Sequence, residues 1–243
     1  MKAVFDIHCH ILHGVDDGSG NLSDSIEMAQ LAFVSGTEGI IATPHCNIPG
    51  VFGNYWNDEM AQRLQKLRAA LKEKNIPVEI YQGQEVFLSK NFENYLEKGG
   101  FITLNKSAYM LAELDFRIDE AAAVSRLQRL ASFGYIPIIA HPERYGFVIE
   151  NPSVIKKIRS SGALVQLNGG SIVGDFGPYV RRTAESILGG GFADFIASDA
   201  HSQYSRTPDL ADIHEYVCGN VSYDYADILL NINPVKVINN ERI

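Results

Sequence analysis

Seven short apolar segments, each followed by a segment with helical periodicity, constrain the fold of this 243-residue chain more than any other feature. The apolar segments predict strands at residues 4–10, 39–45, 77–87, 108–114, 136–141, 163–168 and 192–199. Helices are predicted at residues 22–36, 57–74, 91–98, 119–133, 152–160 and 178–188, and in the tail from residue 208. Strands that alternate with helices in this way form parallel sheets covered by helices.

The alternation predicts an α/β fold, and seven such units in 243 residues favour a closed or nearly closed barrel. We therefore expect one domain over residues 1–243, built as a distorted TIM-like (β/α)7 barrel. An open doubly wound sheet is the alternative. The absence of a G-x-G-x-x-G motif after the first predicted strand weakens that alternative.

Polar side chains recur where the predicted strands end. His8 and His10 lie two residues apart on the first strand, so their side chains share one face, about 7 Å apart. Later strand ends carry His45, Glu85, Glu113, His141, Asp199 and His201, and the loop after the first strand carries Asp16 and Asp17. One histidine at a strand end is usually structural, but five of the seven histidines share this position. Because the C-terminal ends of parallel strands meet at one rim, the pattern predicts a site with several metal ions.

The types of ligand narrow the choice of metal. Imidazole and carboxylate groups without a thiolate, in a set too large for one tetrahedral zinc, suit two or three bridged divalent ions. We expect Mn²⁺ first, with Fe, Zn, Co or Mg as alternatives. Cys9 and Cys46 each adjoin a ligand candidate in the sequence, so on a strand they should face away from the site and lie in the core.

Charge and cysteine content exclude several classes of protein. A net charge of −8 argues against a general nucleic-acid binder, which needs a basic face. None of the three cysteines begins a C-x5-R motif, so a phosphatase with a cysteine nucleophile is excluded. The odd number of cysteines indicates a reducing compartment. No signal peptide or bilayer-spanning run is expected, and we predict a cytoplasmic protein without membrane insertion.

Several short motifs carry a family resemblance. The segments D-I-H-C-H-I-L-H-G-V-D-D-G, A-T-P-H, G-Q-E-V, A-H-P-E-R-Y and I-A-S-D-A-H resemble the polymerase-and-histidinol-phosphatase (PHP) superfamily. Within it, the chain is most similar to the bacterial metal-dependent tyrosine phosphatases of the CpsB/YwqE type, from capsule and exopolysaccharide loci. The likeness extends to N-P-x-x-V-I at residues 233–238. It implies a barrel of the PHP type.

The resemblance also implies three metal sites. The first would be formed by His8, His10, Glu85 and Asp199, the second by Glu85, Glu113 and His141, and the third by Asp17, His45 and His201. Asp16 remains an alternative to Asp17. Asp115 remains an alternative to Glu113, because A-E-L-D departs from the I-E-F segment usual in the family.

Two arginines and one histidine are the implied catalytic residues. Arg144 in H-P-E-R-Y and Arg206 in S-R-T-P correspond to residues expected to hold the substrate phosphate. Arg206 matches less well, because the family usually has G-R-P-P there. His201 or a water could donate a proton to the leaving group. The implied reaction is hydrolysis of a phosphomonoester by a water that the ions activate, without a protein nucleophile.

The implied enzyme is a protein-tyrosine phosphatase acting on the tyrosine-rich tail of a bacterial kinase of polysaccharide synthesis. Histidinol phosphatase, another small-molecule or nucleotide phosphatase, and an inactive metal-bound scaffold are the alternatives. The segment 46–56, with Val51, Phe52, Tyr55 and Trp56, could flank the mouth of the site and stack on a tyrosine ring, or could be an ordinary packed loop. The oligomeric state is open, and a homo-oligomer is one alternative.

Overall fold

Parallel strands form the centre of the structure, a computed structural model that describes residues 3–243. The strands are β1 (Val4–Cys9), β2 (Thr37–Ala42), β3 (His45–Cys46), β4 (Glu79–Gln82), β5 (Glu85–Phe87), β6 (Tyr109–Glu113), β7 (Ile136–Ala140), β8 (Leu164–Asn168) and β9 (Phe195–Ala197). They form a sheet in the order β1-β2-β4 and a larger sheet in the order β3-β5-β6-β7-β8-β9. Every pairing within these sheets is parallel, which confirms the predicted α/β class.

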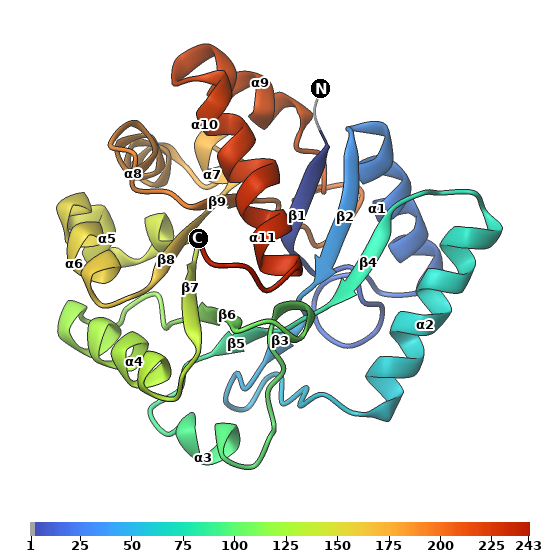
Figure 1. Cartoon of the computed structure of the whole chain (residues 1–243), viewed down its shortest axis with the longest axis horizontal. Coiled ribbons are helices and arrows are strands. Elements are labelled where there is room, and N and C mark those ends of the chain that lie inside the picture. The colour runs from blue at the N-terminus through green and yellow to red at the C-terminus, as the bar shows by residue number, and fades with distance from the viewer. Residues whose placement is uncertain (1–2) are drawn as a thin grey trace.

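Helices surround the strands on their outer side (Figure 1). They are α1 (Leu22–Val34), α2 (Asp58–Glu73), α3 (Glu93–Leu96), α4 (Glu120–Ser132), α5 (Gly146–Glu150), α6 (Ile155–Ser160), α7 (Gly169–Val173), α8 (Pro178–Gly189), α9 (Ala211–Asn220), α10 (Tyr223–Asp227) and α11 (Asn233–Ile238). Short 3-10 turns are η1 (Leu104–Lys106), η2 (Pro142–Arg144) and η3 (Pro152–Val154), and η4 (Ile228–Ile232) is a π-helix. The side chains of Asn21, Asn57 and Asp119 cap α1, α2 and α4, so a polar residue sets the start of each.

Two segments that were each predicted to form one strand form two strands instead, so these two predictions are wrong. The segment 39–45 divides into β2 and β3 around Pro44, and the segment 77–87 divides into β4 and β5 around Gly83. Pro44 has no N–H to donate to a ladder. Gly83 packs so tightly that an added Cβ would lie 2.7 Å from the Ile41 side chain. These two breaks turn the chain from the smaller sheet into the larger one.

The first strand and the chain leaving the last strand lie side by side. The amide of Asp199 donates to the carbonyl of His8 at 2.8 Å, and the amide of His10 donates to the carbonyl of Ala200 at 2.9 Å. Polar residues from the two ends of the sequence therefore meet at one place.

Both faces of the strands are buried, as expected for parallel sheets covered by helices. On the outer face of the larger sheet, Ile139 and Val165 pack with side chains of α4, α6, α8 and α9. A second cluster joins the smaller sheet to α1 and α2. The inner faces meet in a third cluster, to which Ile138 and Phe195 belong. The strand ends are therefore held from both sides.

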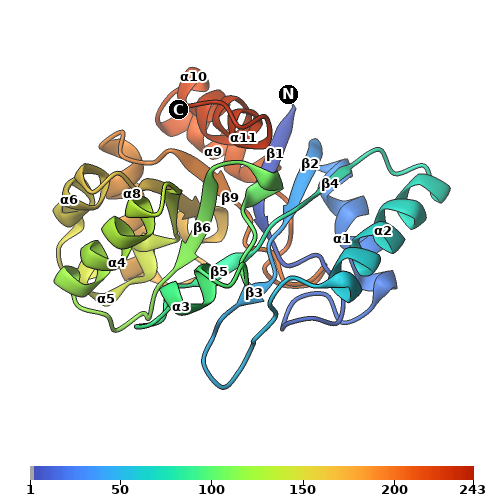
Figure 2. The same cartoon turned by 60° about the horizontal axis from the view of Figure 1, so that its bottom comes forward.

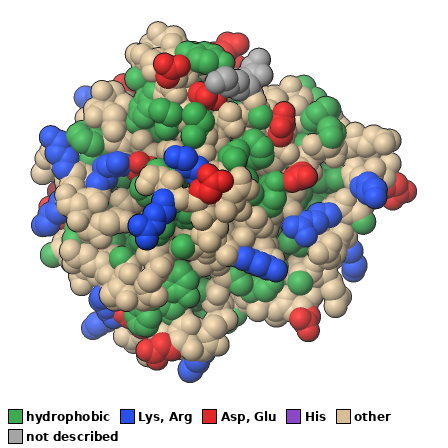
Figure 3. All heavy atoms as spheres, viewed as in Figure 1, with side chains coloured by type: hydrophobic (Ala, Val, Ile, Leu, Met, Phe, Trp, Pro, Cys, Tyr) green, Lys and Arg blue, Asp and Glu red, His purple; other side chains and the backbone are tan. Residues whose placement is uncertain are grey.

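The C-terminal segment covers the N-terminal ends of the strands. Val237 of α11 belongs to the inner cluster. The hydroxyl of Tyr109, the first residue of β6, donates to the carbonyl of Glu241 at 2.6 Å and accepts from the amide of Ile243 at 3.2 Å. In Figure 3 this face shows no histidine among the described residues. Across residues 3–243, no helix combines the length and the apolar character needed to span a membrane.

Candidate metal centre

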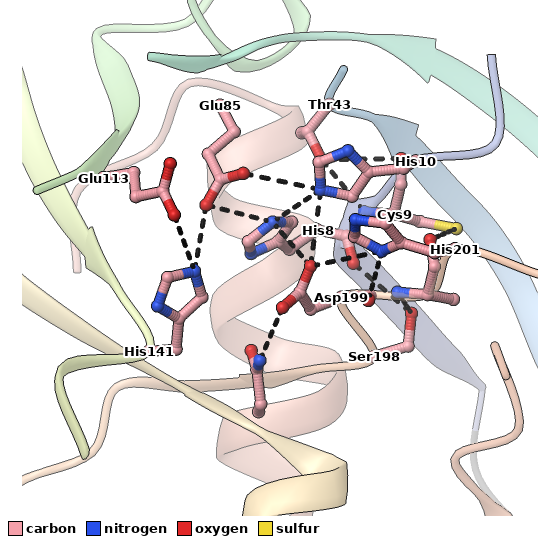
Figure 4. Close-up of polar contacts among 12 residues, drawn as sticks. His8, Cys9, His10, Thr43, Glu85, Glu113, His141, Ser198, Asp199 and His201 are labelled. Carbon is pink, nitrogen blue, oxygen red and sulfur yellow. Dashed lines mark hydrogen bonds and ion pairs between the residues drawn. The ribbon is translucent and has the colours of Figure 1, made fainter. Parts of the chain in front are cut away.

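The C-terminal end of β1 places two imidazoles against two carboxylates. The Nε2 atoms of His8 and His10 lie 3.2 Å apart. Asp199, two residues after β9, brings Oδ1 within 3.3 Å of both atoms. Glu85, the first residue of β5, places one carboxylate oxygen 3.4 Å from His8 Nε2 and the other 3.4 Å from His10 Nε2. Figure 4 shows the four side chains converging on one point.

Further candidates flank this group. His141, directly after β7, places Nε2 3.0 Å from Glu85 Oε1 and 3.9 Å from Glu113 Oε1. Figure 4 shows His141 and Glu113 on one side of the cluster and His201 on the other. Near His201, the Oδ1 atom of Asp17 lies 3.6 Å from Nε2 of His45 and 3.6 Å from Nε2 of His201. The structure thus brings together all nine residues that the sequence nominated as ligands.

Three imidazoles are oriented by an acceptor on Nδ1. The pairs are His8 with Gln166 Oε1 (3.0 Å), His10 with Asp16 Oδ2 (2.7 Å) and His201 with the carbonyl of Asp199 (2.9 Å). An acceptor on Nδ1 favours the tautomer with hydrogen there and a lone pair on Nε2. The three Nε2 lone pairs therefore point into the cluster, as in metal-binding histidines.

Sequence reasoning missed two residues of this network, both on β8. Gln166 accepts from His8, and it donates to Asn168 Oδ1 at 2.9 Å. Asn168 donates in turn to Asp199 Oδ2 at 2.6 Å. The predicted sixth strand was the one strand without a site residue, yet Gln166 and Asn168 have the same two-residue spacing as His8 and His10. That spacing was the signal available.

The structure separates the alternatives that the sequence left open. Asp16 accepts from His10 Nδ1 and from the amide of His45 at 2.9 Å, so it orients a candidate ligand from behind, whereas Asp17 faces the cluster. Glu113 lies beside His141, whereas Asp115 is exposed and accepts from the amide of Arg117 at 2.8 Å. The geometry favours Asp17 and Glu113 as ligands.

Burial and neighbouring charges shift the pKa values of the carboxyl groups and imidazoles in this site. Burial raises the pKa of Glu85 and of Asp199, but imidazoles, His8 first, outweigh burial and hold both well below their usual values. Burial lowers the pKa of His8, but Glu85 and Asp199 raise it above its usual value. Burial, Glu85 and Asp199 together raise the pKa of Glu113 to about 9. A divalent cation bound here would compete with protons for His8 and Glu113, since it requires deprotonated ligands.

The residues present fit such cations. Atoms bound to one ion at about 2.0–2.2 Å lie about 3–3.5 Å from one another, which matches the spacing of 3.2–3.4 Å around His8 and His10. Within the described residues, Nε2 of His201 is buried and makes no hydrogen bond. A buried polar atom without a partner is destabilising, and a cation bound by His201 together with Asp17 and His45 would satisfy it.

Both predicted phosphate-binding arginines reach the edge of the cluster. Arg206 donates to Asp199 Oδ2 at 2.6 Å, and Arg144 donates to the same oxygen at 3.3 Å. The guanidinium carbon of Arg144 lies 4.5 Å from the centroid of the Phe176 ring, and that of Arg206 lies 5.9 Å from it. Asp199 therefore faces the imidazoles with one oxygen and the arginines with the other.

Three residues of the site have a left-handed backbone conformation. The φ angles are +35° at His141, +51° at Asp199 and +49° at Arg206. A left-handed conformation costs a residue other than glycine about 1–2 kcal/mol. Strain of this kind commonly concentrates where function requires a particular side chain.

The cysteines and the loop after β3 also have defined places. Cys9 and Cys46 are fully buried in hydrophobic clusters, as predicted. Figure 2 shows the chain after β3 projecting as a long loop. Within this loop, Phe52 stacks on His45 with ring centroids 5.8 Å apart, whereas Tyr55 stacks on Tyr95 away from the cluster. Phe52 therefore lies beside a candidate ligand, whereas Tyr55 packs against another side chain outside the ligand set, and stacking of this loop on a tyrosine ring stays a prediction.

Comparison with known proteins identifies the family. Residues 4–239 match the family described as capsular polysaccharide synthesis, CpsB/CapC. The chain belongs to the CpsB/CapC family. The resemblance carried by the sequence motifs is therefore confirmed.

This CpsB/CapC chain is similar along most of its length to curated proteins and to a solved structure. It is 38% identical over 205 residues to the tyrosine-protein phosphatase YwqE of Bacillus subtilis, which covers 84% of this chain and 79% of that protein. It is 31% identical over 240 residues to CapC of Staphylococcus aureus, which covers 98% of this chain and 92% of that protein. A structure described as "YwqE from Bacillus subtilis and CpsB from Streptococcus pneumoniae, unique metal-dependent tyrosine phosphatases" matches with a TM-score of 0.89 at 34% identity, over 98% of this chain and 96% of that one.

Proposed function

We propose that this chain is a metal-dependent tyrosine-protein phosphatase that hydrolyses phosphotyrosine in a protein substrate. The observation that carries the proposal is the cluster of imidazoles and carboxylates with two arginines on its edge. The names of the CpsB/CapC relatives support the same activity. Histidinol phosphatase shares this chemistry and is the activity to test against.

The proposed ligands are the nine clustered residues, and Mn²⁺ is the proposed ion. Two or three divalent ions would stabilise negative charge on the phosphoryl oxygens and lower the pKa of a water that attacks phosphorus. Imidazole and carboxylate ligands without thiolate suit Mn²⁺, and also Fe²⁺, Zn²⁺, Co²⁺ and Mg²⁺.

The protein groups position the phosphate and the cluster relative to each other. Arg144 and Arg206 hold the phosphoryl oxygens with charge-assisted hydrogen bonds, while Asp199 keeps both guanidinium groups beside the ligands. Burial and His10 lower the pKa of His201 to about 3, so its imidazole is neutral near pH 7. This favours a ligand role for His201 over the role of proton donor. A phenolate leaving group makes little demand on an acid.

The test compares turnover of a phosphotyrosine peptide with turnover of histidinol phosphate, with Mn²⁺ and then with a chelator. We expect preference for the peptide, loss of turnover with the chelator, and recovery on adding Mn²⁺ back. His141→Ala and Asp199→Asn should each abolish turnover in Mn²⁺. Preference for histidinol phosphate would replace the proposed function, and full activity of either variant would refute the proposed ligands.

The finer predictions accompany this proposal. We propose that the two sheets form one distorted seven-unit barrel, supported by the bonds from β1 to the chain after β9. We also propose that residues 1–243 act as one domain and that the substrate is the tyrosine-rich tail of a kinase of polysaccharide synthesis. The cytoplasmic location stays a prediction. The oligomeric state stays open, with a homo-oligomer as one alternative.

A further inference from the structure

A cavity of about 540 Å³ opens directly onto the metal cluster. Three candidate ligands, Asp17, His45 and Glu113, form its polar wall. The rest of the lining is apolar except for Asp115, and it consists of Ile48, Pro49, Phe52, Phe87, Leu114 and Phe116. A phosphate held at the cluster would therefore direct its ester group into an apolar space.

Phe52 is held in place on one side of this cavity. Its ring is parallel to that of His45, with an interplanar angle of 11° and centroids 5.8 Å apart. A tight turn fixes its backbone, because the Ile48 amide donates to the Phe52 carbonyl at 2.9 Å and the Phe52 amide donates back at 3.1 Å. The ring is thus preorganised, although it comes from a long loop.

Phe116 is held beside a different candidate ligand of the cluster. Its ring is nearly parallel to that of His141, with an angle of 26° and centroids 5.9 Å apart. The guanidinium carbon of Arg144 lies 4.8 Å from its centroid, and the carbonyl of Phe116 accepts from the amide of Gly146 at 3.0 Å. Phe116 therefore adjoins both a candidate ligand and a phosphate-binding arginine.

We infer that this cavity receives the aromatic ring of the substrate, and that Phe52 and Phe116 select aryl phosphates over alkyl phosphates. The inference rests on the proposed phosphatase function and adds the residues that determine its specificity. An aromatic ring between such side chains gains both apolar burial and ring–ring contact. A small alkyl group reaches neither ring, so it gains little from the cavity.

The test uses two ligands that cannot be hydrolysed, phenylphosphonate and methylphosphonate, titrated calorimetrically into the Mn²⁺-loaded protein. The wild type should bind phenylphosphonate at least about 10-fold more tightly. Phe52→Ala and Phe116→Ala should each reduce this ratio by about 3- to 10-fold. Phe52→Ala should leave methylphosphonate affinity within about twofold, because among the described residues the rings beside Arg144 and Arg206 are those of Phe116 and Phe176. Phe133→Ala is the control, at a phenylalanine directly after α4 that is 43% exposed against 39% for Phe116, and it should change neither affinity.

The outcomes distinguish this inference from the function on which it rests. Equal affinity for the two phosphonates, or an unchanged ratio in both variants, overturns the inference even if the protein hydrolyses phosphotyrosine. Selective binding of phenylphosphonate that both variants reduce supports the inference. If the same protein then fails to hydrolyse any phosphate monoester, the proposed phosphatase function is wrong, but the inference that the cavity binds an aromatic ring is retained. Unchanged Mn²⁺ stoichiometry in each variant verifies that the cluster is intact.

Discussion

Replacing Asp16 with asparagine should weaken metal binding without removing a metal site. The Asp16 side chain is fully buried and accepts from His10 Nδ1 at 2.7 Å, from the His45 amide at 2.9 Å and from the Gly18 amide at 3.0 Å. It thereby directs His10 Nε2 into the cluster. Asparagine has the same size, but it loses the charge and one of the two acceptor oxygens.

The expected loss is 10- to 100-fold in Mn²⁺ affinity, or about 1.4–2.8 kcal/mol, the range for groups that orient a metal-binding histidine. The loss should depend on pH. Burial lowers the pKa of His10, but Asp16 and the other carboxylates hold it well above its usual value, so below that pKa a proton competes with the metal. Asp16→Asn lowers the pKa of His10 and weakens this competition. The deficit in affinity should therefore be largest at alkaline pH and should shrink as the pH falls.

Calorimetric titration of Mn²⁺ into chelator-stripped protein at two pH values measures both effects. Asp24→Asn, at a partly exposed position in the first turn of α1, makes the same change in charge and should bind Mn²⁺ as the wild type does. Asp17→Asn should lower the number of ions bound. If Asp16→Asn lowers that number and Asp17→Asn does not, the two roles are reversed. An affinity loss below about threefold would refute the orienting role.

Three further predictions concern the arginine pair, a buried hydroxyl and a buried carboxyl. Arg206→Lys should lower kcat/KM for a phosphotyrosine peptide by about 10- to 100-fold, because lysine lacks the forked guanidinium group that can reach Asp199 and the phosphate together. Arg182→Lys on α8 is the control. Equal kcat/KM in the two variants would contradict the phosphate-binding role of Arg206. Tyr145→Phe should lower the free energy of unfolding measured in urea by about 1–3 kcal/mol, because the amide of Leu114 loses the buried hydroxyl that accepts its hydrogen bond at 3.0 Å. Tyr204→Phe, at a position that is 84% exposed, should leave this free energy unchanged. Burial raises the pKa of Glu143 to about 7 from the 4.5 of the free side chain, so the unfolded chain loses this proton first and the wild type loses stability as the pH rises between those values. Glu143→Gln removes this loss, so the free energy of unfolding of the variant relative to wild type should rise by up to roughly 3 kcal/mol between pH 4.5 and 7 and then level off. A difference that does not change with pH would show that Glu143 is not protonated in the folded protein.

Much of the site was predictable because the C-terminal ends of parallel strands meet at one rim. His8, His141 and Asp199 each lie on or just after an apolar strand, and parallel strands bring such positions together without any knowledge of tertiary contacts. The α/β class was predictable for the same reason. Neither inference depended on where a strand ends to within a residue.

What could not be predicted depended on single residues outside a periodic pattern. Asp16 and Asp17 are neighbours in a loop, and no periodicity says which one faces the cluster. Pro44 and Gly83 divide two strands through a missing N–H and a close contact that appears only in three dimensions. Phe52 and Phe116 lie in connecting segments, where sequence alone does not distinguish a ring at the site from a ring that packs the loop.

The left-handed backbone at His141, Asp199 and Arg206 sets activity against stability in this protein. Glycine would adopt these conformations without strain, so exchange at Arg206 should make the fold easier to maintain while it removes a phosphate contact. A selection for thermostability alone would therefore drift toward inactive chains at these three positions. Stabilised yet active variants are better sought far from the rim, for example at Val34, an apolar side chain that is 73% exposed at the end of α1.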